Sequence, residues 1–220
     1  ENKLLKIKAK KIVIATGSQQ RPIPFINNDL PGIFLGSGIQ KLMHLDGVKP
    51  GHNTVVICED DSGYIVTDQL LDSGIRVKAL IDLREKEVIS KDKLEKLEKM
   101  KIPIYISYKV IKAYGKKSVS GIMISDSLDV NKKLKIKCDS ISMSGVFTPT
   151  NELLFQATYE GSYILESPVN IVKMPNRDEK MRVDKNIYVV GDVTQKRTLD
   201  AAIIEGQVAG ESIIKSINNS

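Results

Sequence analysis

Few residues of this chain have the types and spacing needed for acid–base, nucleophilic or metal chemistry. The two cysteines, Cys58 and Cys138, are eighty positions apart, and neither belongs to a C-x-x-C pair. The two histidines, His44 and His52, lie beside an apolar helix face and a turn, so we expect them to be structural or surface residues. Two cysteines and two histidines are too few to predict a zinc site, and two cysteines do not predict a disulfide framework. We therefore expect no catalytic residue and no metal site.

Two other segments have a pattern that is typical of nucleotide-holding folds. Residues 11–17 (KIVIATG) and 186–192 (NIYVVGD) each read as a buried strand that runs into a glycine turn, and the second turn adds a carboxylate. They resemble the "ATG" and "GD" signatures of flavoproteins that have two dinucleotide domains. The resemblance makes five residues candidates for cofactor binding: Ala15, Thr16, Gly17, Gly191 and Asp192.

The loop at residues 58–63 (CEDDSG) stands where a second phosphate loop belongs. A working G-x-G-x-x-G turn needs its glycines for the tight turn, for close approach of the pyrophosphate, and for helix–strand packing. Here Cys58 replaces the first glycine, Asp60 replaces the second, and only the third remains, as Gly63. The carboxylates of residues 59–61 would satisfy the free N–H groups of the helix and repel a phosphate. We expect this degenerate loop to be closed to NAD. Asp82, where a ribose-binding acid would stand, is expected to be an ordinary surface carboxylate.

The elements that position these residues follow from the hydrophobic pattern. Residues 54–58 and 77–81 predict buried strands, and residues 62–73 predict the helix between them, which together make a parallel, right-handed unit. The alternation in residues 4–9 predicts a half-exposed strand. Two prolines, Pro168 and Pro175, lead us to expect no helix in residues 151–182.

The last element is predicted to be a helix that Thr198 caps. Apolar residues recur in it at helical spacing, among them Ile203 and Ile214. Gly206 and Gly210 lie one turn apart, so we expect them to allow close approach to a neighbouring strand.

The order of these elements predicts an α/β chain of two domains. Residues 1–27 and 151–220 would form a discontinuous first domain, and residues 28–150 would form a second domain inserted into it. A length of 220 residues, of which 41% are hydrophobic and 27% charged, suits a soluble globular protein with a well-buried core. The first residue is Glu1 and not methionine, which favours a chain that lacks upstream residues.

Charge and hydropathy exclude several classes of partner. We attribute the net charge of +6 to lysines that are dispersed over the whole length and lie on solvated faces. A nucleic-acid binder would concentrate its lysines and place aromatic residues between them. No apolar run approaches the roughly 18 residues of a membrane span, and the N-terminus does not look like a signal peptide. We expect a cytoplasmic protein that binds neither nucleic acid nor membrane.

Residues 10–34 (KKIVIATGSQQRPIPF…NNDLPGIF) make the family resemblance more specific. This run is similar to the α subunits of heterotetrameric sarcosine oxidases, and to related α subunits of proline dehydrogenases, opine oxidases and hydrogen cyanide synthases. The likeness continues at residues 47–51, in the CEDDSGY loop, at Ser144-Gly145 and at residues 149–156. It ends with Gly191-Asp192 and the helix that contains Ala201-Ala202 and Glu205-Gly206. The resemblance implies an FAD/NAD(P)-binding, two-dinucleotide-domain flavoprotein fold that lacks its N-terminal nucleotide-binding unit.

The resemblance also implies roles for individual residues. Thr16, Gly17 and Asp192 would face a nucleotide, with Asp192 near the ribityl or diphosphate region. The N-terminus of the last helix, with Leu199 and Ala201, would point toward the flavin ring. FAD or another adenine nucleotide, such as NAD or ATP, would bind only if the missing segment is supplied, and otherwise no cofactor would bind.

Three functions stay open at this point. The first is a nucleotide-holding and assembly subunit, or a portion of one, of a sarcosine oxidase-like amine or amino-acid oxidoreductase; such a chain is not catalytic alone and has a flavin-bearing oxidoreductase subunit as its partner. The second is a stand-alone NAD(P)H-dependent FAD reductase, against which the closed loop and the absent C-x-x-C speak. The third is a non-enzymatic scaffold remnant. A homo-oligomer is a further alternative for the assembly.

Overall fold

The computed structural model describes residues 4–89, 91–99, 101–157, 163–165, 173–195 and 198–218. The chain divides into unit 1, residues 1–19 and 147–220, and unit 2, residues 20–146. The boundaries expected from the sequence, after residues 27 and 150, thus differ from those of the structure, after residues 19 and 146. Residues 20–27 lie in unit 2 because Ile23 is buried in its core and Phe25 packs against the same cluster.

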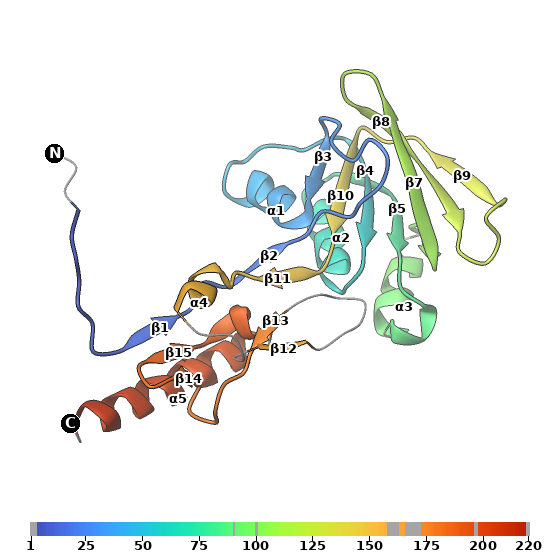
Figure 1. The fold of residues 1–220 in the computed structure, drawn as a ribbon. Helices are drawn as coiled ribbons and strands as arrows, with labels where there is room; N and C mark the ends of the chain where they lie inside the picture. Colours follow the sequence, from blue (N-terminus) through green and yellow to red (C-terminus); the bar gives the residue numbers. More distant parts are fainter. Residues whose placement is uncertain are drawn as a thin grey trace. The chain divides into compact units, whose positions relative to one another are not determined.

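Unit 2 is built on a five-stranded, fully parallel sheet with the order β3-β10-β4-β5-β6 (Figure 1). The strands are β3 (Ile33–Leu35), β10 (Ser140–Ser144), β4 (Asn53–Cys58), β5 (Arg76–Asp82) and β6 (Ile104–Ile106). The apolar runs of β4 and β5 are continuous because both faces of a covered parallel sheet are buried. The predicted strand–helix–strand unit is thus present, with α2 (Ser62–Asp72) as its helix.

Two layers cover the faces of this sheet. On one side, Val56 and Cys58 share a buried cluster with residues of α1 (Gly36–His44), α2 and α3 (Lys91–Lys99). On the other side, Val55 and Ile57 pack with an antiparallel sheet of β7 (Tyr108–Gly115), β8 (Val119–Asp126) and β9 (Lys133–Ile136). A short 3-10 helix, η1 (Lys86–Val88), follows β5.

Unit 1 contains a three-stranded sheet with the order β1-β15-β14. Strand β1 (Ile12–Ile14) runs parallel to β15 (Ile187–Val189), and β14 (Arg182–Asp184) is antiparallel to β15. The long helix α5 (Leu199–Asn218) packs on one face through Ala209, which is buried with Tyr188 and Val190. The other face holds Ile14, Val189 and Leu154 in a separate cluster.

The remaining elements of unit 1 are short. Strand β11 (Phe147–Pro149) pairs with β2 (Ser18–Gln20), whose last residue is the first of unit 2, and β12 (Tyr163–Leu165) pairs with β13 (Lys173–Pro175). The helix α4 (Glu152–Ala157) and the 3-10 helix η2 (Gly191–Thr194) complete the unit. Among the described residues, none of the helices combines the length and the apolar character that a membrane-spanning segment needs.

Several local predictions are wrong. Residues 4–9 are exposed and form no strand, because no other described segment pairs with them. The expectation of no helix in residues 151–182 fails at α4, which ends before both prolines and is therefore unaffected by them; Pro168 itself lies outside the described residues. In α5, an added Cβ at Gly206 or Gly210 would meet nothing within 4 Å in the described part of the chain, so neither glycine serves a close approach.

Candidate functional site

The parallel pair β1–β15 brings the two glycine turns together. Ile14 is in register with Val189, and the N–H of Val190 donates to the carbonyl of Ile14 at 3.1 Å. Because both strands run in the same direction, the turns that follow them lie at the same edge of the sheet. The structure thus places Ala15, Thr16 and Gly17 beside Gly191 and Asp192, although about 170 residues separate the turns in sequence.

Both turn glycines adopt a backbone conformation that side chains disfavour. The φ angle is +71° at Gly17 and +79° at Gly191, in the left-handed region where a Cβ adds strain. A Cβ built on either residue would meet nothing within 4 Å among the described residues, so the space in front of both turns is open. An open pair of glycine turns at the carboxyl ends of parallel strands fits the approach of a ligand to the backbone.

A third segment is bonded to the first turn. The hydroxyl of Thr16 donates to the carbonyl of Thr150 at 2.6 Å, and the N–H of Thr150 donates to the carbonyl of Gly17 at 2.9 Å. Residues 149–156, which belong to the family resemblance, are thus joined to the first glycine turn through Thr150.

Glu205 fixes the second turn and was not predicted as a site residue. Its side chain is only 3% exposed, and one carboxylate oxygen accepts a hydrogen bond from the N–H of Gly191 at 2.9 Å. The hydroxyl of Thr194 donates to the same carboxylate at 3.1 Å. The guanidinium of Arg177, 13% exposed, forms an ion pair with it at 2.5 Å. Burial raises the pKa of Glu205, but these hydrogen bonds outweigh burial, so its pKa lies below the ordinary value.

The sequence carried one signal for this residue. Glu205 stands four positions before Ala209, so the two share the face of α5 that packs on the sheet. A charged residue on the buried face of a helix requires a buried partner. The partner, Arg177, is 28 positions upstream and could not be identified from the sequence.

The N-terminus of α5 is capped as predicted. The side-chain oxygen of Thr198 accepts a hydrogen bond from the N–H of Ala201 at 3.2 Å, so one free donor of this helix end is already satisfied. Leu199 is 76% exposed on the first turn. Of the apolar residues named for this helix, Ile203 and Ile214 are also exposed and therefore not part of a buried stripe.

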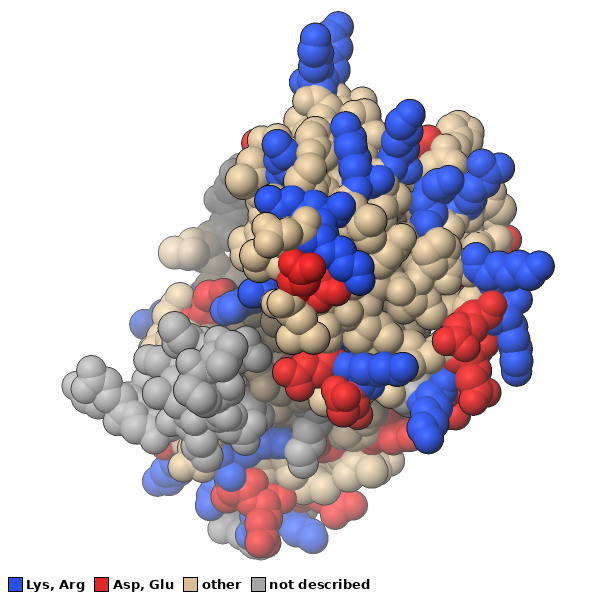
Figure 2. Space-filling model, turned by 90° about the vertical axis from the view of Figure 1, so that its right-hand side faces the viewer, with Lys and Arg blue, Asp and Glu red and all other residues tan. Residues whose placement is uncertain are grey.

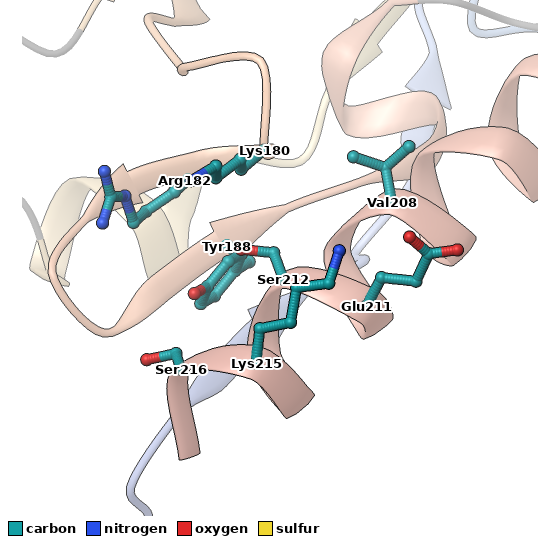
Figure 3. Close-up of a pocket in the computed structure, with 8 residues that line it drawn as sticks. All are labelled: Lys180, Arg182, Tyr188, Val208, Glu211, Ser212, Lys215 and Ser216. Atoms are coloured by element: carbon teal, nitrogen blue, oxygen red, sulfur yellow. The ribbon is translucent and has the colours of Figure 1, made fainter. Parts of the chain in front are cut away.

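One cavity of unit 1, of about 290 Å³, lies elsewhere (Figure 3). It is lined by the C-terminal half of α5 together with Lys180, Arg182 and Tyr188. Arg182 is paired with Asp178 at 2.9 Å. None of the predicted cofactor-binding residues lines this cavity, so it does not coincide with the glycine turns.

The loop at residues 58–63 is closed by its own side chains. The carboxylate of Asp60 accepts hydrogen bonds from the N–H of Ser62, at 2.9 Å, and from the Ser62 hydroxyl. The backbone of Gly63 lies so close to Cys58 that a Cβ on this glycine would overlap the Cys58 Cβ and lie 2.8 Å from its Sγ. Gly63 therefore retains the packing role of the third glycine, while the position of the second is filled by a carboxylate.

Asp82 is buried, and its prediction as a surface carboxylate is wrong. Its side chain is 0% exposed and accepts hydrogen bonds from the Tyr64 hydroxyl at 3.0 Å and from Arg84 Nε and Nη2 at 3.0 and 2.8 Å. Arg84 also reaches Asp61 at 3.0 Å, so one guanidinium joins the loop to the end of β5. Burial, followed by the nearby charge of Asp82, raises the pKa of the Cys58 thiol and that of Tyr64.

These contacts do not fit a dinucleotide in unit 2. The Ser62 N–H at the start of α2 already donates to Asp60, and Asp82 has its oxygens occupied by Arg84 and Tyr64 instead of facing a ribose. The open glycine turns of unit 1 do fit a nucleotide, as one side of a site.

The fold and these turns define an α/β chain of the FAD/NAD(P)-binding class. The chain belongs to the pyridine nucleotide-disulphide oxidoreductase family, whose family model matches residues 1–209.

The chain is also similar to two kinds of known protein. The sarcosine oxidase subunit alpha of Rhizobium meliloti is 24% identical over 98% of this chain and 20% of its own length. That of Corynebacterium sp. strain P-1 is 42% identical over 36% of this chain and 8% of its own length. The crystal structure of T. acidophilum thioredoxin reductase has a TM-score of 0.74 at 20% identity and covers 94% of this chain and 66% of that protein. The chain thus spans about a fifth or less of these sarcosine oxidase subunits and under two thirds of the reductase.

Proposed function

We propose that this chain is a nucleotide-holding portion of a sarcosine oxidase-like amine or amino-acid oxidoreductase. Unit 1 contributes one side of a site for FAD or another adenine nucleotide, and the chain does not oxidise the substrate by itself. The observation that carries this proposal is the pair of open, positive-φ glycine turns at Gly17 and Gly191, side by side at one sheet edge. Bound FAD supplies electron-accepting chemistry, and the residues of this chain bind and orient it.

The open edge of β1 supports the view that the site is completed by another segment. Among the described residues, β1 pairs with β15 alone, which leaves its other edge free. Ile12 and Val13 point to opposite faces of the strand, yet they are 49% and 47% exposed. An edge strand with half-exposed apolar residues on both faces is suited to pairing with a further strand. We infer that this strand belongs to a glycine-rich unit, upstream in the same polypeptide or on a partner.

The closed loop of unit 2 favours this function over a stand-alone NAD(P)H-dependent reductase. Such an enzyme needs a second nucleotide in unit 2, where the Ser62 N–H at the start of α2 already donates to Asp60 and Arg84 pairs with Asp61 and Asp82. The sequence also lacks a C-x-x-C redox pair. Unit 2 then has a structural role in the assembly.

Calorimetric titration tests nucleotide binding. FAD, ADP, ATP and NAD are titrated into the chain together with the segment that completes the site, and into the same assembly with Asp192→Asn or with a matched control, Asp184→Asn, which changes an exposed carboxylate of β14. We expect at least one nucleotide to bind, and Asp192→Asn to weaken it about tenfold because a hydrogen bond to a charged group is lost. The control should change little.

Two results would contradict the proposal. Absence of binding to all four nucleotides favours a scaffold, and equal effects of the two substitutions would remove Asp192 from the site. Purification from the native host tests the partner: we expect a flavin-bearing oxidoreductase subunit to co-purify, and a cofactor-free monomer without one would argue against the assembly.

A further inference from the structure

The net charge of the chain is concentrated on one small antiparallel sheet. Residues 108–138, which form β7, β8 and β9, hold eight lysines and two aspartates, a net charge of +6 that equals the net charge of the whole chain. All other residues together are therefore balanced, and the even dispersal expected from the sequence is wrong. In Figure 2, which faces the side of Figure 1 that carries these strands, lysine and arginine side chains gather over the upper part.

Strand register places the lysines in two rows on the outer face. Lys109 and Lys133 flank Ser125, and Lys112 and Lys135 flank Met123. The residues that alternate with them, such as Ile122 and Ile124, are fully buried in the core of unit 2, so the lysine positions face outward. Because neighbouring strands are about 4.8 Å apart, the rows on β7 and β9 are separated by about 10 Å. The β8 side chains between them are small or uncharged.

The charges of these rows are not neutralised within the described part of the chain. Of the eight lysines, Lys132 forms an ion pair, with Asp126 at 3.4 Å, and the other seven form none there. Two lysines lie instead over one aromatic ring: Lys112 Nζ and Lys135 Nζ are 5.0 and 4.0 Å from the ring centroid of Tyr114. The four lysines of the two rows thus lie close to one another and pair with no acidic side chain among the described residues, which favours an anionic ligand.

The chemistry of the face disfavours nucleic acid. Single-stranded nucleic acid is bound by aromatic rings on which bases stack, but the ring of Tyr114 is covered by the two ammonium groups. Residues 108–138 contain no arginine, the residue best suited to bidentate recognition of phosphates and guanine. Lysine is a point charge that suits carboxylates of any orientation.

We propose that the outer face of β7–β8–β9 is a docking surface for an extended acidic segment of another protein. On β9, Lys133 and Lys135 repeat every second residue, a spacing of about 6.8 Å that matches the acidic side chains on one face of an extended peptide. The two rows bind the carboxylates, and the peptide backbone lies over β8 between them. This surface lies in unit 2 and does not depend on nucleotide binding by unit 1.

Fluorescence anisotropy with a labelled twelve-residue peptide of alternating glutamate and serine tests the proposal. Two double variants are tested, and each reverses the charge of one lysine in each row. The first combines Lys112→Glu and Lys135→Glu, and the second combines Lys109→Glu and Lys133→Glu; we call both row variants. The matched control reverses Lys86 and Lys99, which are exposed lysines of unit 2 outside the sheet. We expect binding at low salt that weakens about tenfold in each row variant, falls with added salt and stays within about twofold of wild type in the control.

Circular dichroism establishes that each variant is folded, and the two independent pairs guard against one failing to fold. The proposal is overturned if the control weakens binding as much as the row variants, or if the peptide does not bind. It is also overturned if a twenty-nucleotide poly-dT strand, or vesicles of phosphatidylcholine and phosphatidylserine, bind more tightly than the peptide and respond to the same substitutions.

Discussion

The substitution Glu205→Gln should open the second glycine turn while leaving unit 2 intact. Glutamine keeps the size of the side chain and can still accept one hydrogen bond, but it leaves the guanidinium of Arg177 nearly buried without a counter-ion. It also weakens the bonds from the Gly191 N–H and the Thr194 hydroxyl. Breaking a buried ion pair from one side costs about 3 kcal/mol or more, because the remaining charge is not compensated.

Hydrogen exchange measured by mass spectrometry reports this cost locally. A loss of about 3 kcal/mol corresponds to exchange that is about 100-fold faster in peptides that cover β15 and η2, if they open reversibly. Peptides from β4, in unit 2, serve as an internal reference. Glu211→Gln is the matched control, since Glu211 is an exposed glutamate of the same helix.

A double substitution separates the ion pair from simple packing loss. Adding Arg177→Met to Glu205→Gln removes the uncompensated charge, so part of the lost protection should return. Exchange in Glu205→Gln within threefold of wild type, or equal acceleration in Glu211→Gln, would refute the view that Glu205 fixes the turn.

Three further outcomes follow from the described contacts. Because the pKa of Glu205 is lower in the folded chain, its stabilising effect is present above about pH 4.3 and is lost as the pH falls through the folded pKa. The free energy of unfolding, measured in urea at pH 6 and pH 3, should show this loss in wild type and less of it in Glu205→Gln. Gly63→Ala should destabilise unit 2 by about 1–3 kcal/mol through overlap with Cys58, whereas Gly38→Ala, on α1 with open space around it, should not; equal thermal shifts would contradict this. Burial raises the pKa of the Cys58 thiol, and raises the pKa of Cys138 to about 12, so iodoacetamide at pH 8 should label neither in the native chain and both after denaturation; rapid native labelling would show that the cores are open.

The elements that could be predicted are those with a strong local pattern. The apolar runs of β4 and β5 and the amphipathic helix between them were predicted correctly, because a buried parallel strand and a packed helix each have a distinct hydrophobic period. Thr198 was identified as a cap for the same local reason. The strand prediction for residues 4–9 was wrong, because alternating apolar and polar residues form a strand only where another strand is present to pair with it.

The candidate site was predictable in its parts but not in its assembly. The glycine turns were recognised by their sequence, yet their contact depends on the parallel pairing of β1 and β15. Asp82 was misread because its partners, Tyr64 and Arg84, are brought together by the packing of α2 on the sheet and by the turn after β5. Glu205 was missed because its burial depends on how α5 packs.

The sequence by itself determined the strand–helix–strand unit of β4, α2 and β5, the position of the glycine turns and the loss of two glycines from the loop at residues 58–63. Each of these depends on residue type and short-range spacing, which sterics and hydrophobic period fix locally. Only the tertiary structure decided which charges are buried and paired, as at Asp82 and Glu205, and which are collected on one surface, as on β7–β9. The reason is that burial and electrostatic compensation depend on distances between side chains that are far apart along the chain, and folding alone sets those distances.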